Sequence, residues 1–387
     1  MLLVGSALAG GEVYAEHVEN RYVHALAPKL FLLKNQGSAL QRAAFRQSDL
    51  LPLFGSSELL AKDDPYHASN VFETYPTGFT VFPVGDLQTT TLIMVQALAA
   101  IGPDLRGKKV AFSLSPYWYY QINEYAQEYA GNFSPLHAGQ LLFNANLTFP
   151  LRGRAARRMQ RYPATLENRP LLRFAVNRLA DDSPLDRLIY YAVRPLGQLQ
   201  NWILTLQDHW ESLAYIRQQH LKPSPGRRSA SLDWPAVISR AEREFERHND
   251  NNQFGFDNHW YDRRFERTVA RNTITEASFR AGLAASEEWT DLELLLSVAK
   301  ELGAQPLVLC APGPGFFYDY LGISDEPRQA YYQKFEQVVR AHGVPVLAFA
   351  DHDRDTTFVL DPAAHLSEKG WAYFDQALDG FYHGTLQ

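Results

Sequence analysis

Short apolar runs that end at glycine, serine or proline recur along the chain. They are typical of buried parallel strands, because a strand covered on both faces loses the alternation of polar and apolar positions. Five runs fit this pattern, at residues 50–54, 79–84, 109–114, 306–311 and 344–349. Apolar positions recur at helical spacing instead over residues 87–101, 291–302 and 327–342. Strands that alternate with helices in this way predict a parallel α/β sheet.

The middle of the chain has a different pattern. Residues 185–220 predict one or two long helices rich in Tyr, Trp and Leu, whose aromatic side chains we expect in the core, and residues 234–248 predict a charged helix. We therefore predict one discontinuous α/β domain, formed by residues 50–122 and 272–387. A mainly helical insertion, residues 123–271, interrupts it.

The first 49 residues predict a separate helical segment, with a break at Pro28. It begins with an apolar stretch, but this reaches the acidic Glu12 before the roughly 20 apolar residues that a membrane span needs. The stretch also lacks the basic flank of a signal peptide. Two interpretations stay open: an ordinary first helix, or the outer end of an N-terminal membrane anchor whose start is missing from this sequence.

Composition adds a few constraints. The chain has 387 residues, of which 46% are hydrophobic and 21% charged, as expected of a folded protein. Its net charge of −6 gives no reason to expect a nucleic acid partner, and we interpret the basic run at residues 152–158 as a solvated face. Cys310 is the only cysteine and lies inside a predicted strand, so we expect a core residue and no intrachain disulfide.

Candidate chemistry begins where the first apolar run stops. Gly55 permits a tight turn from strand to helix and delivers Ser56 and Ser57 to the carboxyl edge of the sheet, where open α/β folds place their active sites. Either serine could simply cap the helix that follows. Near the other end of the chain, Asp361 and His365 supply a carboxylate and a base. An early serine followed by a late Asp and His is the order used by serine hydrolases of the SGNH type.

Other chemistries are weakly represented. The segment 351–355 contains one His and three Asp, but it lacks a second cluster at metal-ligand spacing, and we interpret it as a solvated loop. The chain has neither a phosphate-binding loop with its lysine nor a dinucleotide fingerprint. We therefore predict no metal and no cofactor.

Several short blocks occur in the order expected of one known family. They are Phe54-Gly55-Ser56-Ser57-Glu58-Leu59, Val84-Gly85-Asp86-Leu87-Gln88, Ser115-Pro116-Tyr117-Trp118, Asn252-Gln253-Phe254-Gly255, Asp319-Tyr320-Leu321-Gly322, Arg328-Gln329-Ala330-Tyr331-Tyr332 and His365-Leu366-Ser367-Glu368-Lys369-Gly370-Trp371. Together they resemble the DltD family, which acts outside the membrane in D-alanylation of lipoteichoic acid. The resemblance covers most of the chain from residue 50 onward and is weakest in the middle insertion.

The resemblance implies a three-layer α/β/α SGNH-hydrolase-like fold. It also implies an extracytoplasmic location at the cell membrane, through an N-terminal anchor absent or truncated in this chain. The partners that it implies are a DltB-like membrane-bound O-acyltransferase, the acyl carrier protein pathway, and teichoic acid or another envelope polymer. It identifies Ser57 as the nucleophile and His365 as the base. The family pattern is Asp-x-x-His, whereas Asp361 lies four residues before His365, so Asp351, Asp353 and Asp355 stay open as alternative acids.

The remaining site residues follow from the same blocks. The backbone N–H groups of Ser57 and Gly85 fit an oxyanion hole by position, and Gln88, Tyr117 and Trp118 are candidates for substrate binding. These residues predict a serine-dependent acyltransferase that moves D-alanyl, or a related acyl group, onto an envelope polymer through an acyl-serine. Two alternatives are an esterase or thioesterase that removes acyl groups, and a non-catalytic scaffold partner of the O-acyltransferase.

Overall fold

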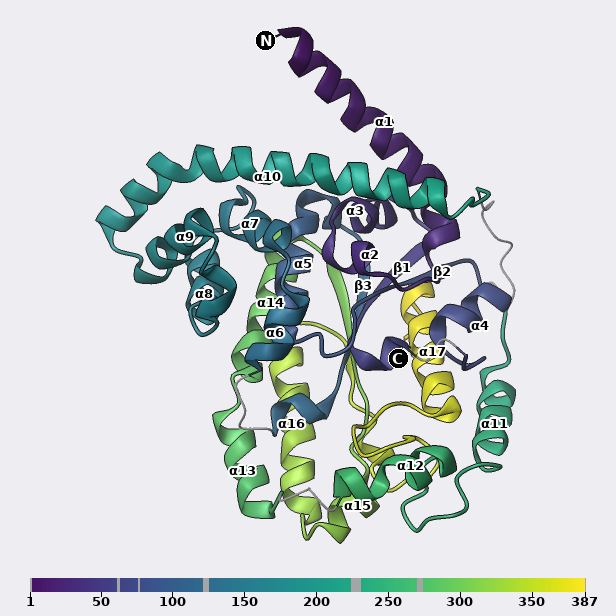
Figure 1. Cartoon of the computed structure of the whole chain (residues 1–387). Helices are drawn as coiled ribbons and strands as arrows, with labels where there is room; N and C mark the ends of the chain where they lie inside the picture. Colours follow the sequence, from purple (N-terminus) through teal and green to yellow (C-terminus); the bar gives the residue numbers. More distant parts are fainter. Residues whose placement is uncertain are drawn as a thin grey trace.

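The computed structural model describes residues 2–60, 63–75, 77–120, 125–223, 231–269 and 274–386. A five-stranded parallel sheet lies at its centre, with strand order β2-β1-β3-β4-β5 (Figure 1). The strands are β1 (Leu50–Phe54), β2 (Thr80–Val84), β3 (Lys109–Leu114), β4 (Gln305–Cys310) and β5 (Val346–Leu347). Phe54 pairs with Val84 on one side and with Phe112 on the other. The predicted parallel α/β class is confirmed.

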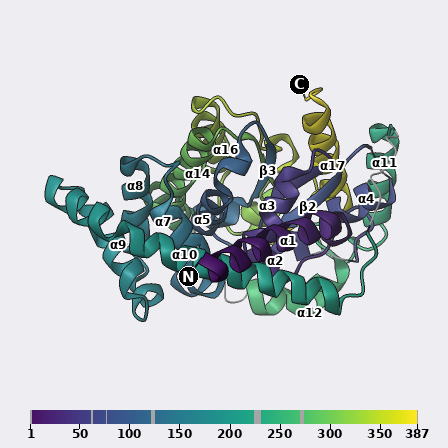
Figure 2. The same cartoon turned by 90° about the horizontal axis from the view of Figure 1, so that it is seen from above.

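Helices cover both faces of this sheet. One face packs against α3 (Ala39–Arg46), α5 (Thr91–Ile101), α14 (Glu288–Leu302) and α16 (Asp325–Ala341), and the other against α4 (Ala68–Thr74) and α17 (Glu368–His383) (Figures 1 and 2). Successive strand residues point to opposite layers, so that Phe112 joins the first core and Ala111 the second. The three-layer α/β/α arrangement follows from this double burial.

The N-terminal residues form three helices, as expected. They are α1 (Leu2–Leu26), α2 (Leu32–Gln36) and α3, and α1 ends two residues before Pro28. Among the described residues, no helix combines the length and the apolar character needed to cross a membrane.

In the described part of residues 125–269, the regular elements are all helices, and loops connect them. They are α6 (Ala126–Asn132), α7 (Pro135–Phe143), α8 (Phe149–Met159), α9 (Pro170–Asp181), α10 (Pro184–Gln218), α11 (Trp234–Phe245) and α12 (Asn258–Val269), followed by α13 (Glu276–Ala285) and α15 (Gly315–Tyr320). Buried side chains of α7, α8 and α9 belong to the same hydrophobic core as α5 and α14. Both predicted ends of the insertion, at residues 122–123 and 271–272, involve positions outside the described residues.

Three local predictions were wrong. The last strand contains only two of the six predicted residues, and Phe349, two residues beyond its end, adopts a left-handed conformation with φ of 46° that is incompatible with a strand. Helix α5 begins at Thr91 and not at residue 87, because Gln88 also has a positive φ, 63°. Helix α4 lies within residues 63–78, where no helix is predicted above; the side chain of His67 accepts a hydrogen bond from Ser69 N–H at its start.

Candidate active site

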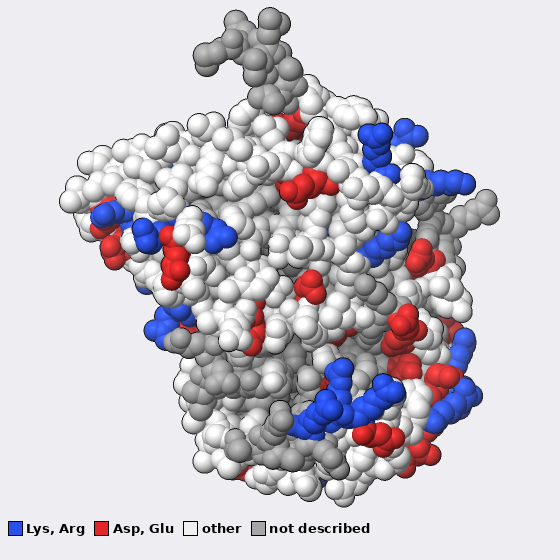
Figure 3. All heavy atoms as spheres, viewed as in Figure 1, with Lys and Arg blue, Asp and Glu red and all other residues white. Residues whose placement is uncertain are grey.

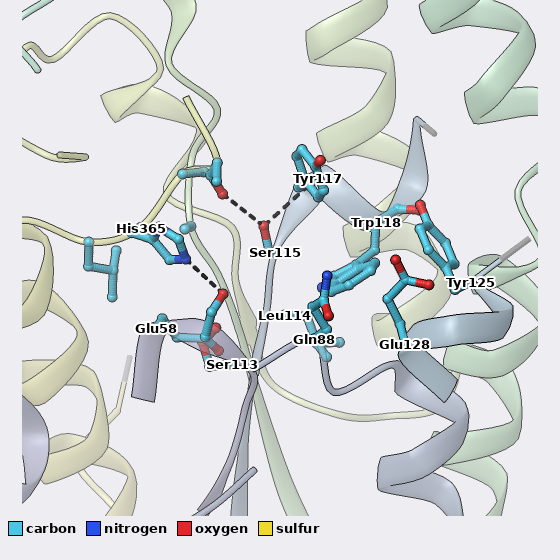
Figure 4. A pocket seen from close by; sticks show the side chains of 15 residues that line it. Glu58, Gln88, Ser113, Leu114, Ser115, Tyr117, Trp118, Tyr125, Glu128 and His365 are labelled. Atoms are coloured by element: carbon cyan, nitrogen blue, oxygen red, sulfur yellow. Dashed lines mark hydrogen bonds between the residues drawn. The ribbon is translucent and has the colours of Figure 1, made fainter. Parts of the chain in front are cut away.

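A pocket of about 180 Å³ opens at the carboxyl ends of β1 and β3 (Figure 4). These two strands lie where the strand order changes direction, which is where open α/β sheets bind ligands. Its lining residues are Ser57, Glu58, Gln88, Ser113, Leu114, Ser115, Tyr117, Trp118, Tyr125, Glu128, Ala311, Ala363, Ala364, His365 and Leu366. Segments far apart in the sequence therefore meet at this edge of the sheet.

The turn after β1 presents Ser57 to the pocket. Glu58 folds back so that its Oε1 accepts a hydrogen bond from Ser56 N–H at 3.0 Å. A Cβ on Gly55 would lie 2.6 Å from that same oxygen, so a side chain there would displace the Glu58 carboxylate; the φ of Gly55 is outside the left-handed region, so the turn does not use the special backbone freedom of glycine. Ser57 then begins a 3-10 helix, Ser57–Leu60, and its hydroxyl contacts His365 and caps nothing. The capping interpretation of Ser57 was therefore wrong.

The loop between residues 359 and 366 holds the histidine and its carboxylate. Val359 and Leu366 form an antiparallel bridge, and Leu360 N–H donates to the His365 carbonyl at 2.8 Å. Inside this closed loop Ala364 has a φ of 62°, which takes up the extra residue relative to Asp-x-x-His spacing. Asp361 Oδ1 accepts from the N–H of residue 363 at 2.9 Å, fixing the carboxylate.

The three side chains form a continuous hydrogen-bonded chain. Ser57 Oγ lies 2.7 Å from His365 Nε2, and His365 Nδ1 lies 2.7 Å from Asp361 Oδ2. With the Nδ1 proton donated to the carboxylate, Nε2 is left to accept the proton of the serine hydroxyl. Burial alone would lower the pKa of His365, but the charge of Asp361 and its hydrogen bond outweigh burial and raise this pKa above 6.5.

The other acids considered from the sequence face elsewhere. Asp353 lies 3.2 Å from the buried Arg328 and accepts a hydrogen bond from Tyr332 at 3.2 Å. Asp355 pairs with His352 and Lys369. The side chain of Asp351 is 84% exposed. Of the four candidates, Asp361 is the one hydrogen-bonded to His365.

Gly85 lies beside the serine turn, but its N–H has a partner. It donates to Asn35 Oδ1 at 3.1 Å, and Gly85 does not line the pocket. Its predicted role as an oxyanion donor stays a prediction, and that role requires this bond to be exchanged for one to the substrate. Gly85 has a φ of 152°, and a Cβ there would lie 2.0 Å from the Gly55 carbonyl oxygen. This position therefore accepts only glycine.

We expect Gly85→Ala to lower the free energy of unfolding by about 2–4 kcal/mol, because the new Cβ meets backbone that cannot move without displacing the serine turn. Urea denaturation measures the loss. Gly107→Ala is the matched control, since Gly107 also has a positive φ, 71°, but open space around it; it should lose about 1 kcal/mol. Equal losses in the two variants would show that the close approach to Gly55 is unimportant.

Aromatic and polar side chains form the opposite wall of the pocket. Trp118 packs edge-on against Tyr125 with ring centroids 4.7 Å apart, and the Tyr125 hydroxyl donates to the Trp118 carbonyl at 2.8 Å. Figure 4 shows Gln88 and the carboxylate of Glu128 beside the Trp118 ring. Tyr117 lies next to Ser115, whose Oγ accepts from the Tyr117 N–H. All three predicted substrate-binding residues, Gln88, Tyr117 and Trp118, thus line the pocket.

Sequence reasoning missed Tyr125 and Glu128, which also line this wall. Both lie in the segment predicted as a mainly helical insertion, residues 123–271. Helix α6, which carries Glu128, contacts α5, and this packing brings the carboxylate to the pocket. No local motif marks either residue, so no sequence signal could have identified them.

Cys310 is a structural residue. Its thiol is fully buried and lies 3.2 Å from the Tyr331 hydroxyl, and burial raises its pKa to about 12. Among the described residues, no group of three His, Cys, Asp or Glu side chains is placed to hold a metal ion.

The fold and this site define an α/β/α protein with a hydrogen-bonded Ser–His–Asp constellation at the carboxyl edge of its sheet, a set of groups that serine hydrolases on several unrelated folds also have. The family model described as "DltD protein" matches residues 28–383. The chain is also 30% identical to Protein DltD of Bacillus subtilis (strain 168), over 92% of this chain and 88% of that protein. For Protein DltD of Staphylococcus aureus (strain NCTC 8325 / PS 47) the identity is 26%, over 91% and 86% of the two chains. The chain belongs to the DltD family.

Proposed function

We propose that this protein is an acyltransferase of the cell envelope that transfers D-alanyl to teichoic acid, or to a similar polyol polymer, through an acyl ester on Ser57. Membership of a family involved in D-alanylation supports the choice of acyl group. The observation that carries the chemistry is the hydrogen-bonded chain Ser57–His365–Asp361, with 2.7 Å at both contacts. In this chain His365 can act as the general base that a serine needs to attack at neutral pH, and Asp361 orients that base.

The first half-reaction loads the serine. His365 Nε2 takes the proton of Ser57 Oγ as this oxygen attacks the carbonyl carbon of an activated acyl donor. Asp361 stabilises the imidazolium that forms, because its carboxylate already holds Nδ1. The tetrahedral intermediate collapses, the bond from the carbonyl carbon to the donor's leaving group breaks, and His365 returns the proton to that group. An ester between Ser57 and the acyl group results.

In the second half-reaction the acyl group passes from Ser57 to the acceptor. A hydroxyl of the acceptor polymer gives its proton to His365 and attacks the ester carbonyl, and Ser57 leaves as the protonated alcohol. Water competes with the polymer at this step, so the walls around the ester matter. Trp118, Tyr117 and Tyr125 supply apolar surface beside the serine.

The size of the pocket supports a small acyl group. At about 180 Å³ it lies below the roughly 300–1,000 Å³ typical of sites that enclose drug-sized ligands. It is large enough for an aminoacyl group, and the acceptor polymer would remain outside with one hydroxyl presented at the opening.

Glu128 gives this pocket a means of recognising an amine. Its half-buried carboxylate lies beside Trp118 and Tyr125, and the aromatic rings of these two residues also favour a cation. The α-ammonium of a D-alanyl group is such a cation. We expect Glu128→Gln to raise KM for a D-alanyl donor about tenfold, equivalent to about 1.4 kcal/mol, and to leave KM for a propionyl donor unchanged.

Steady-state kinetics with the two donors test the role of Glu128. The propionyl donor is the internal control, because it has the same length and lacks the amine. If both KM values rose equally, Glu128 would be shaping the pocket without binding the ammonium.

The same proposal includes the protein's surroundings. A location on the outer face of the cell membrane, an N-terminal anchor, and a membrane-bound O-acyltransferase that supplies the alanyl group all fit a family of the envelope. Pull-down of the full chain with its candidate O-acyltransferase from detergent extracts would test that partnership.

The deciding experiment compares transfer with hydrolysis. Purified protein is given an activated D-alanyl donor with and without glycerol-phosphate polymer, and polymer ester and free D-alanine are both quantified. The proposal predicts that ester formation exceeds release to water when polymer is present. An esterase would release D-alanine at the same rate in both mixtures, and a scaffold would do neither.

A further inference from the structure

Helix α10 buries mostly polar side chains and exposes many apolar ones, which is the reverse of an ordinary surface helix. The side that faces the protein is largely polar, with buried Asn201, Thr205, Asp208, His209 and Ser212. These groups have partners within the protein: Asp208 accepts from the N–H groups of residues 38 and 39 at 2.8 Å each, and thereby caps α3. The expectation that the aromatic side chains of this segment lie in the core holds for Tyr190 and Tyr215 and was wrong for Tyr191, Trp202 and Trp210, which are exposed.

Its outward side carries a continuous row of apolar residues, flanked by exposed Gln198, Gln200 and Gln207. Successive outward positions are separated by three or four residues, which places them on one face of a helix. They are Leu185, Leu188, Ala192, Leu196, Leu199, Ile203, Leu206 and Trp210, here called the outer stripe. Leu188 is 69% exposed, Leu196 60% and Trp210 75%. The outer stripe runs for about 38 Å at 1.5 Å per residue.

Charged residues are absent from the central part of this face. The sequence from Pro195 to Gln207 contains none, and Asp208, which follows, is buried against α3. Figure 3 shows a broad uncharged surface along α10. A monomeric soluble protein rarely leaves a continuous apolar surface of this length uncovered.

The chain near the outer stripe indicates what covers it. Helix α1 contacts α10 and projects beyond it on the outer side of the molecule (Figure 1). The sequence of α1 carries no charged residue before Glu12. Where the two helices meet, Tyr14 and Trp210 line a hollow together with Arg21 and Arg217. Aromatic rings beside arginine are the groups that favour the headgroup region of a bilayer.

We propose that α10 lies flat in the outer layer of a lipid bilayer, with the outer stripe among the upper acyl chains and Arg21 and Arg217 at the headgroups. A helix with one apolar and one polar face, too polar overall to span, binds membranes in this way. The inference concerns how the protein is held and is independent of the chemistry proposed for Ser57. It gives the protein a second membrane contact and fixes its orientation on the surface.

A bilayer fits these features better than a soluble partner. The outer stripe is long and narrow, α1 leaves one end of α10 at an angle and points away from the body of the molecule, and Trp210 of the stripe lies at that end beside the arginines. A soluble partner would give no reason for the uncharged first turns of α1 to project on the same side.

The test uses the full chain and vesicles of phosphatidylglycerol or phosphatidylcholine. We expect flotation with both, tighter binding to phosphatidylglycerol because of the two arginines, and a shift of tryptophan emission to shorter wavelength. Leu199→Gln combined with Ile203→Gln should weaken vesicle binding at least tenfold, since Leu199 is 53% and Ile203 47% exposed and their exposed apolar surface would contact lipid. Phe316→Gln is the control, because Phe316 is also exposed but lies on α15, at the far end of the molecule from α10.

Thermal unfolding without lipid checks that the double variant folds like the parent protein. The rate at which the double variant hydrolyses a soluble acyl donor checks that its active site is intact. Retained stability with a tenfold loss of vesicle binding supports the proposal. Equal vesicle binding by parent and double variant, or no binding by either, overturns it. A parent that is dimeric without lipid, together with a double variant that is monomeric, also overturns it by identifying a second copy as the occupant of the outer stripe.

Discussion

Ser57→Ala is expected to reduce D-alanyl transfer by about 10⁴-fold or more and to abolish the covalent acyl intermediate. The reason is chemical: the substitution removes the oxygen that forms the ester, and the remaining groups can only bind the donor and polarise its carbonyl. Intact-protein mass spectrometry after a brief reaction with the donor should show the mass of one alanyl group on the parent protein and none on the variant. Peptide mapping should place that group on Ser57.

Ser56→Ala is the matched control. Ser56 is adjacent in sequence and buried, and its Oγ makes no hydrogen bond among the described residues. We expect this variant to retain transfer and the acyl intermediate. An active Ser57→Ala protein would refute the acyl-serine mechanism, and loss of cellular D-alanylation only in variants of the protein's surface would favour the scaffold alternative.

Asp361→Asn is expected to lower kcat by about 10³–10⁴-fold while leaving KM nearly unchanged. The amide keeps the volume of the side chain, but it cannot stabilise the imidazolium and it favours the wrong tautomer of His365. Asp351→Asn is the control, because Asp351 is exposed and faces away from His365. Comparable losses in both variants would mean that Asp361 is not the orienting acid.

The pH profile separates this role of Asp361 from a merely structural one. His365 must be neutral to accept the serine proton, so activity should rise with pH through the pKa of His365, which Asp361 raises above 6.5. In Asp361→Asn the carboxylate that stabilises the charged imidazole is gone, while burial still disfavours the charge. The midpoint of the profile should therefore move to lower pH. A midpoint that stays in place would show that Asp361 does not act on the imidazole.

The strands and the serine turn were predictable because their causes are local. A strand buried on both faces must be apolar throughout, and β1 to β4 carry that signal in their own residues. The turn after β1 follows directly from the end of the apolar run, and Gly55 and Ser57 lie next to that end in the sequence. The weakest strand, β5, was overpredicted because apolar residues alone do not show whether the backbone can pair.

The acid partner of His365 could not be settled from spacing. The four-residue separation from Asp361 departs from the expected pattern, and only the closed loop between Val359 and Leu366, with its left-handed Ala364, brings the carboxylate back to Nδ1. Glu128 lies at the pocket because α6 packs against α5, and this packing cannot be read from the local sequence. Both outcomes depend on long-range geometry.

By itself, the sequence determined which segments are strands, which serine follows the first of them, and that residues 185–220 are helical. The tertiary structure decided that Asp361 is hydrogen-bonded to His365, that Glu128 lines the same pocket as His365, and that the polar side of α10 is buried. The physical reason is that periodicity distinguishes the two faces of a helix without saying which is buried. Burial depends on partners such as the N–H groups at the start of α3, which Asp208 satisfies from 170 residues away.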